Sequence, residues 1–254
     1  MYVVNCSVRQ TVVKGKIQIG TSGWHYDHWR GNFYPESLSK REWLDYYAQQ
    51  FPCVELNNSF YRLPAAGTIE GWCKQTPASF TFVVKASRLI THMKKLHECE
   101  EAFARFYDVI KNFGKKLGPI LFQLPPHWSA NADRLDTFLR ILPAGQQSVF
   151  EFRDPGWYCD AIYQLLEKHN AALCLSDFDG VTDPDVVTAD FLYVRLHGPA
   201  GDYRGSYRPE ALKDWASRIR QWQSRDKDVY LFFNNDEAAY AANNAAELTR
   251  LCLA

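Results

Sequence analysis

The sequence predicts one α/β domain built as a closed barrel of eight parallel strands, and three observations lead to this expectation. The chain has 254 residues, a usual length for a single α/β barrel. Short apolar runs alternate eight times with longer helix-like stretches, which is typical of a parallel sheet. No GxGxxG or Walker motif supports an open, doubly wound sheet instead. The expected fold is therefore a TIM-type (β/α)8 barrel.

Each expected strand is a short apolar run that leads into polar residues. In chain order the strands are expected at residues 17–20, 53–57, 81–85, 120–124, 148–152, 172–176, 191–197 and 229–233. We expect one domain over residues 17–254, preceded by an N-terminal extension at residues 1–16, because no linker or low-complexity segment interrupts the alternation.

Helices are expected between these strands, at residues 40–50, 68–76, 100–113, 132–141, 161–170, 209–223 and 237–252. Ser39 and Asn131 have the side chains of N-caps, and Pro209 fits the first turn of a helix. The segment between the sixth and seventh strands is too short for a full helix with two loops. The sixth helix is therefore expected to be short or missing.

Composition narrows the class of protein. Lys plus Arg equals Asp plus Glu, 29 each, so nucleic acid is a possible but not a favoured partner, since nucleic-acid binders usually carry a basic excess. No apolar run is long enough to cross a membrane, and the N-terminus lacks the features of a secretory signal. The seven cysteines are scattered and never spaced CxxC. These features predict a cytoplasmic protein with reduced thiols.

Polar residues gather where the expected strands end. In α/β barrels the chemistry lies on that face, at the carboxyl ends of the strands. Side chains two residues apart in a strand share a face, so Glu55 with Asn57, Glu151 with Arg153, and Arg195 with His197 point the same way. The candidate site residues on or just after the strands are Glu55, Asn57, Lys85, Gln123, Glu151, Arg153, Asp177, Arg195, His197, Asn234 and Asp236.

These residue types suggest roles. Lys85, Arg153 and Arg195 form an expected clamp for an anion, because guanidinium groups bind phosphate or carboxylate in forked geometry. Lys85 is alternatively a Schiff-base nucleophile. The candidate acids and bases are Glu55, Glu151, Asp177 and His197. The competing interpretation is structural: the charges form ion pairs that fill the barrel, and His197 bonds to backbone.

Loop aromatic residues and possible metal ligands complete the expected site. Trp24, Tyr61 and Trp157 fall in loops above the expected barrel, where they would cover the apolar face of a ligand. Metal ligands would come from the set Glu151, Asp177, His197 and Asp236. The chain has no HxH or HExxH motif, and nearby arginines compete for the same carboxylates. We therefore expect neither a metal nor an organic cofactor.

Several of these stretches together resemble the YecE-like family, known as domain of unknown function 72. They are 20-GTSGWHYDHWRGNFYP, 42-EWLDYYAQQFPCVELNNSFYRLP, 80-FTFVVKASRLITH, 118-GPILFQLPP, 150-FEFRDPGW, 188-TADFLYVRLHG, 203-YRGSY and 229-VYLFFNND, in order over residues 17–253. The resemblance implies a TIM-type barrel with a polar cleft at the strand ends, and no established reaction. The family often has His where Asp154 follows Arg153 here. The motif positions are Trp24, Glu55, Asn57, Tyr61, Lys85, Gln123, Glu151, Arg153, Arg195, His197, Asn234, Asn235 and Asp236.

Three functions from different classes fit this sequence. The first is an enzyme acting on a small anionic substrate, phosphorylated or sugar-acid-like, in a charged pocket of the barrel. The second is a metal-dependent phosphodiesterase or DNA-repair-like endonuclease, by analogy of fold alone. The third is a non-catalytic module that binds a small ligand. The sequence leaves the oligomeric state open.

Overall fold

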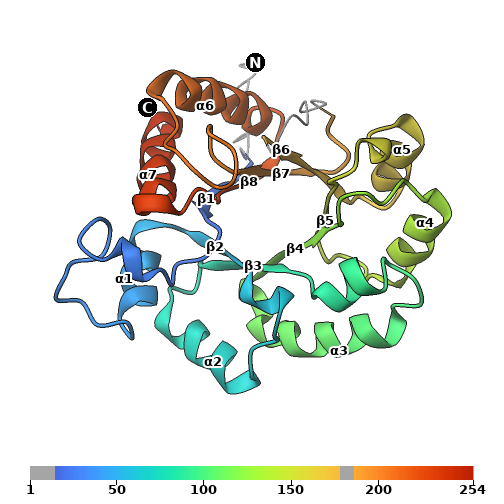
Figure 1. Cartoon of the computed structure of the whole chain (residues 1–254), viewed down its shortest axis with the longest axis horizontal. Coiled ribbons are helices and arrows are strands. Elements are labelled where there is room, and N and C mark those ends of the chain that lie inside the picture. The colour runs from blue at the N-terminus through green and yellow to red at the C-terminus, as the bar shows by residue number, and fades with distance from the viewer. Residues whose placement is uncertain (1–14, 178–185, 254) are drawn as a thin grey trace, which may run out of the picture.

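The computed structural model describes residues 15–177 and 186–253 and shows the expected barrel (Figure 1). Eight strands run parallel in the order β1-β8-β7-β6-β5-β4-β3-β2. Their bounds are β1 (Ile17–Thr21), β2 (Cys53–Leu56), β3 (Thr81–Lys85), β4 (Leu117–Gln123), β5 (Ser148–Glu151), β6 (Ala172–Ser176), β7 (Phe191–Leu196) and β8 (Asp228–Phe233). Between β1 and β2, within the described residues, the ladder is reduced to the bridge Ser22–Glu55, so the barrel is nearly closed.

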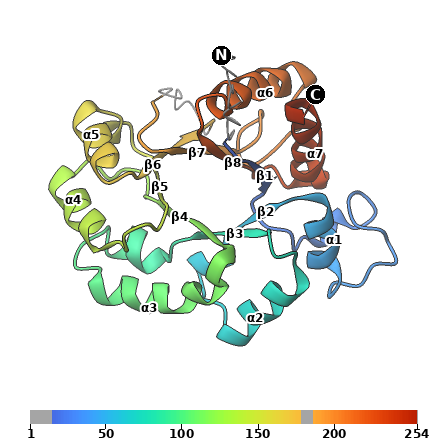
Figure 2. The same cartoon turned by 180° about the vertical axis from the view of Figure 1, so that it is seen from behind.

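Seven α-helices of the described residues form an outer layer around the strands, as the two opposite views show (Figure 1, Figure 2). They are α1 (Trp43–Gln50), α2 (Ala66–Gln75), α3 (Glu100–Ile110), α4 (Ala132–Ile141), α5 (Asp160–Lys168), α6 (Pro209–Gln223) and α7 (Tyr240–Leu253). The helix between β6 and β7 was expected to be short or missing. Residues 186–190 of this connection form no helix, and residues 178–185 lie outside the described part of the chain. Residues 1–14 of the expected extension also lie outside it. None of the described helices is long and apolar enough to cross a membrane.

The expected helix starts are partly confirmed. Asn131 caps α4 by accepting a hydrogen bond from the backbone N–H of Arg134, at 2.9 Å, and Pro209 occupies the first turn of α6. The expectation for Ser39 was wrong, because α1 begins only at Trp43. The Ser39 hydroxyl donates to the carboxylate of Glu42 in the preceding turn and caps nothing.

The strands place two kinds of side chain inside the barrel. A separate apolar cluster, which includes Cys53, Val83, Leu121, Val149 and Tyr193, fills its lower part. Because side chains alternate along a strand, the residues two positions further on face the same interior at the carboxyl ends. Those residues are Glu55, Lys85, Gln123, Glu151 and Arg195. The upper part of the barrel is therefore polar and charged.

Gly20 marks a close approach of β1 to β2. A Cβ atom at this position would lie 2.3 Å from the carbonyl oxygen of Cys53, which is fixed backbone. We expect Gly20→Ala to lower the free energy of unfolding by about 1–3 kcal/mol, the usual cost of overpacking, in urea denaturation. Gly67→Ala is the control, since a Cβ atom there has nothing within 4 Å. Equal stability of Gly20→Ala and the parent chain would contradict the close approach.

Candidate functional site

Arg195 of β7 lies at the centre of a buried ion network. Its Nε and Nη2 donate to the two oxygens of Glu55, at 3.0 and 2.8 Å, and its Nη1 donates to Glu151 at 2.6 Å. Tyr193 and Ser22 also donate to Glu55, at 2.6 and 2.7 Å. Arg195 is 1% exposed, and Glu55 and Glu151 are fully buried. One guanidinium from β7 thus joins carboxylates from β2 and β5 across the barrel.

A second arginine extends the network towards the mouth of the barrel. Arg153 forms an ion pair with Glu151, and its side chain is 5% exposed. The Nε2 atom of His197 lies 3.3 Å from Glu151, and its Nδ1 atom lies 3.2 Å from the amide nitrogen of Asn234. The Nη2 atom of Arg153, which can only donate, lies 3.2 Å from the same Nε2 atom, so this imidazole nitrogen faces both the arginine and the carboxylate.

The network holds its members in fixed charge states. Burial raises the pKa of Glu55 and Glu151, but the arginine charges and hydrogen bonds outweigh burial and lower both below the usual range. Burial lowers the pKa of His197 to about 4, and Glu151 offsets only part of this effect. At neutral pH the two carboxylates are therefore ionised and the imidazole is neutral. None of these three groups exchanges a proton near pH 7.

Above this buried layer lies a ring of polar side chains, which we call the outer ring; its members are half-buried except for the side chain of Arg153, which is 5% exposed. Each member ends or follows a different strand, and together they come from β2, β3, β4, β5, β6 and β8. The outer ring consists of Asn57, Lys85, Gln123, Arg153, Asp177 and Asn234. A solvent-accessible ring supported by a buried hydrogen-bonded layer is the arrangement that holds binding groups in fixed positions.

Lys85 is the outer-ring cation with the fewest charged contacts. Its Nζ donates to the side-chain oxygen of Gln123 at 2.6 Å and lies 4.6 Å from the ring centre of Phe60. Within the described residues, no carboxylate lies within ion-pair distance of Nζ. Burial, and then the charge of Arg195, lower the pKa of Lys85 to about 8. Lys85 is therefore an ammonium that exchanges its proton just above neutral pH.

Asp177 supports the loop after β7. One oxygen accepts a hydrogen bond from the backbone N–H of His197 at 2.6 Å, and the other accepts from the hydroxyl of Tyr207. That hydroxyl in turn accepts from the backbone N–H of Gly198, at 2.7 Å. Burial raises the pKa of Asp177, while these hydrogen bonds oppose the effect. The geometry gives Asp177 a positioning role for the loop that carries His197.

Three network members were missed by reasoning from the sequence. Tyr193 precedes Arg195 by two residues, and Ser22 follows Gly20 by two, so strand alternation alone would have placed both in the barrel. Tyr207 lies in a loop far from Asp177 in the chain, and no spacing rule connects the two.

The loop aromatics do not gather over the network as expected. Trp157 is fully buried, stacks on Phe152 with ring centres 4.8 Å apart, and belongs to the core. Tyr61 is 81% exposed. Trp24 is buried against the edge of Trp72, at 5.3 Å. The three aromatic residues therefore do not cover one ligand site: Trp157 lies in the core, Tyr61 lies on the surface, and Trp24 lies at a neighbouring cavity.

The residues named as candidate metal ligands do not lie together. The carboxylate of Asp236 lies 3.3 Å from His28, whereas Glu151 is paired with two arginines. Throughout residues 15–177 and 186–253, no group of three His, Cys, Asp or Glu side chains is placed to hold a metal ion.

The comparisons with known proteins agree with the fold. Residues 18–253 match the model of the family described as protein of unknown function DUF72. The chain is 28% identical to UPF0759 protein YunF of Bacillus subtilis, over 92% of this chain and 94% of that protein. It is 29% identical to UPF0759 protein YecE of Escherichia coli K12, over 45% of this chain and 43% of that protein.

Two solved structures show the same barrel. A DUF72 family protein of Thermotoga maritima superposes with a TM-score of 0.83 at 26% identity, covering 94% of this chain and all of that chain. One from Enterococcus faecalis superposes with a TM-score of 0.81 at 20% identity, covering 94% and 96%. The sequence match over nearly the whole barrel shows that this chain belongs to the DUF72 family, the YecE-like proteins of unknown function.

Proposed function

We propose that the protein is an enzyme that binds a small anionic, hydroxyl-bearing substrate in the outer ring. The observation that carries this proposal is Lys85, a half-buried ammonium whose nearest acceptor is the neutral amide of Gln123. Burying a cation without a carboxylate is costly, so a chain retains it where an anion completes the site. A phosphate or a carboxylate supplies that anion, and the mouth of an α/β barrel is where such substrates bind.

The surrounding groups fit the rest of such a substrate. The amides of Asn57, Gln123 and Asn234 offer donors and acceptors for hydroxyl groups. Lys85, with a pKa of about 8, transfers a proton near neutral pH, which is the property of a general acid or base. Scattered cysteines favour a reducing compartment, so we propose the cytoplasm as its location.

Arg195 has a different role in this proposal from the one that the sequence suggested. Its guanidinium is occupied by two carboxylates and shielded from solvent. We therefore assign direct contact with the anion to Lys85 and Arg153. Arg195, Glu55 and Glu151 act as positioning residues, and the two glutamates stay ionised rather than carry protons.

Lys85→Met is expected to weaken binding of the anion without lowering the stability of the protein. Loss of a charged hydrogen bond costs about 1.5–3 kcal/mol of binding, roughly a 10- to 100-fold weaker affinity for the anion. The measurement is a thermal-shift screen of phosphates, sugar acids and nucleotides with the parent chain and the variant, followed by calorimetric titration of each hit. Hits are then incubated with the protein and followed by NMR, because conversion distinguishes an enzyme from a binding module. No hit among these classes, or hits unchanged by Lys85→Met, would contradict the proposal.

The same variant should be more stable than the parent chain near pH 7. The folded pKa of about 8 lies below the unfolded value of 10.5, so keeping the ammonium protonated below pH 8 destabilises the folded state. Lys85→Met removes that cost, and we expect a gain of about 1–2 kcal/mol that shrinks between pH 8 and 10.5.

Lys116→Met is the matched control for stability. Its ammonium donates to three protein oxygens, at 2.7, 2.7 and 2.9 Å, so removal leaves acceptors unpaired. This variant should be less stable than the parent chain. A loss of stability in both lysine variants would mean that Lys85 is a structural group.

A further inference from the structure

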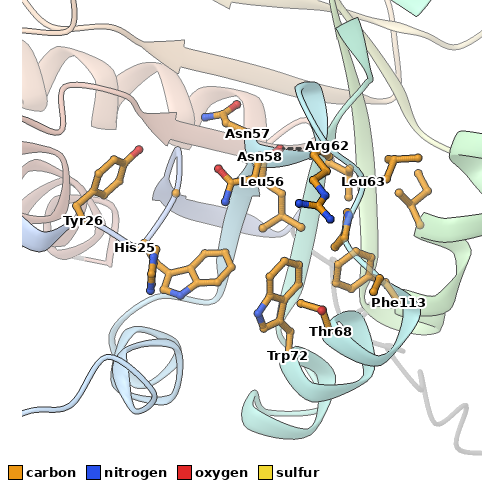
Figure 3. Close-up of a pocket in the computed structure, with 17 residues that line it drawn as sticks. His25, Tyr26, Leu56, Asn57, Asn58, Arg62, Leu63, Thr68, Trp72 and Phe113 are labelled. Carbon is orange, nitrogen blue, oxygen red and sulfur yellow. Dashed lines mark hydrogen bonds between the residues drawn. The ribbon is translucent and has the colours of Figure 1, made fainter. Parts of the chain in front are cut away.

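We propose a second ligand site, outside the barrel interior, for a small aromatic carboxylate. A cavity of about 710 Å³ lies between helix α2 and the outer face of β2 and β3 (Figure 3). This volume is within the range of small-molecule sites. Asn57 of the outer ring borders the cavity, but Lys85, Arg153 and Arg195 do not line it, so the cations of the barrel mouth lie outside this site.

The cavity exists because α2 does not pack closely on the sheet. Of its ten residues, the helix fully buries Ile69 alone, whereas helices of this outer layer commonly bury three or more, as α4 does. The space left under α2 is walled by outward-facing side chains of β2 and β3, by the end of α3 and its continuation, and by the loop after β1. The apolar wall consists of Trp24, Leu56, Trp72, Val84, Ile110 and Phe113.

The aromatic rings of this wall favour a flat apolar ligand. Trp24 and Trp72 meet edge to face, with ring centres 5.3 Å apart and planes at 89°. Their rings border the cavity together, as Figure 3 shows for the labelled Trp72 opposite Leu56. Aromatic rings packed at such angles offer both faces and edges to a further ring. An aromatic body therefore gains contacts here that a flexible polar ligand does not.

The polar part of the lining selects an anion. It contains the guanidinium of Arg62 and the imidazole of His25, and no acidic side chain. Arg62 is exposed, and within the described residues its side chain makes no hydrogen bond or ion pair. In Figure 3 its guanidinium extends from the β2–α2 connection towards Trp72. A carboxylate matches this fork with two parallel hydrogen bonds, so we assign Arg62 to the acidic group of the ligand.

The test compares two probes of nearly equal size, indole-3-acetate and its neutral amide, indole-3-acetamide, by calorimetric titration of the full chain. We expect the acid to bind at least tenfold more tightly than the amide, because only the acid carries a negative charge that pairs with the guanidinium of Arg62. Arg62→Gln should remove this preference while leaving binding of the amide unchanged. Thr68→Trp, which places an indole from an exposed helix position at the cavity, should abolish binding of both probes.

Two controls keep this proposal separate from the proposed function. Arg225→Gln removes an exposed arginine away from the cavity and should bind the acid like the parent chain. Lys85→Met should also bind the acid with the affinity of the parent chain. Binding at the cavity is therefore tested independently of the proposed function of the outer ring. Equal affinity for acid and amide, no binding of either, or an unaltered preference in Arg62→Gln would overturn the proposal. Self-association that Thr68→Trp abolishes would also overturn it, because a second copy would then occupy the groove.

Discussion

Arg195→Ala is expected to lower the free energy of unfolding by about 3–5 kcal/mol, a large part of the stability of an ordinary domain. Removing the guanidinium leaves Glu55 and Glu151 buried together without the charge that they share. The cost is that of Glu55 left without a cation and of Glu151 left with Arg153 alone, and it exceeds the net value of the ion pairs. Urea denaturation of the parent chain and the variant at pH 7 measures it directly.

Arg250→Ala is the matched control, because Arg250 makes the same two-point contact with one carboxylate at the surface of the protein. Arg250 donates through Nε and Nη2 to the two oxygens of Glu247, at 2.9 and 2.7 Å, just as Arg195 does to Glu55. Its side chain is 68% exposed, so its removal should cost less than about 1 kcal/mol. Similar losses in the two variants would show that burial of the Arg195 network contributes little.

Acidification from pH 6.5 to 4 is expected to cost about 3 kcal/mol of stability through His197 alone. The folded pKa of His197, about 4, lies below the unfolded value of 6.5. Between these values the unfolded chain binds a proton that the folded chain does not, so stability falls as the pH falls. Glu55 and Glu151 have lowered pKa values in the folded state, so their contribution is lost below about pH 4.5.

His197→Gln distinguishes the contribution of the imidazole to the pH dependence of stability from that of the two carboxylates. The variant should show a shallower decrease in the free energy of unfolding between pH 6.5 and 4 than the parent chain, whatever its stability at pH 7. His97→Gln, at an exposed histidine, should leave the slope unchanged. An unaltered slope in His197→Gln would show that the imidazole is protonated as easily in the folded chain as in the unfolded one.

The barrel and the composition of its mouth were predictable for a simple physical reason. Parallel strands buried on both faces appear as short apolar runs, and their carboxyl ends meet on one face of a barrel. The period of two along each strand is enough to place Glu55, Glu151 and Arg195 on one interior surface. Strand bounds differed by one to three residues, as for β2, which ends at Leu56, and β4, which begins at Leu117.

Pairing and packing could not be predicted in the same way. Sequence spacing shows which side chains face the barrel interior, but not that Arg195 binds both glutamates and leaves Lys85 with an amide. An aromatic residue in a loop has the same sequence signal whether it packs inwards, as Trp157 does, or faces solvent, as Tyr61 does. The cavity under α2 depends on how far one helix stands from the sheet, which no local pattern encodes.

The measurement that tests the central claim most directly is the NMR titration of Lys85. Lysine labelled with 13C at Cε reports the pKa of each ammonium, and Lys85→Arg assigns the signal. We predict a pKa of about 8 in the free protein and a clear rise when a phosphate or sugar acid from the screen binds, because an anion stabilises the charged form. A pKa near 10.5 in the free protein, or one that no anion raises, would contradict the claim that Lys85 is a cation awaiting an anionic ligand.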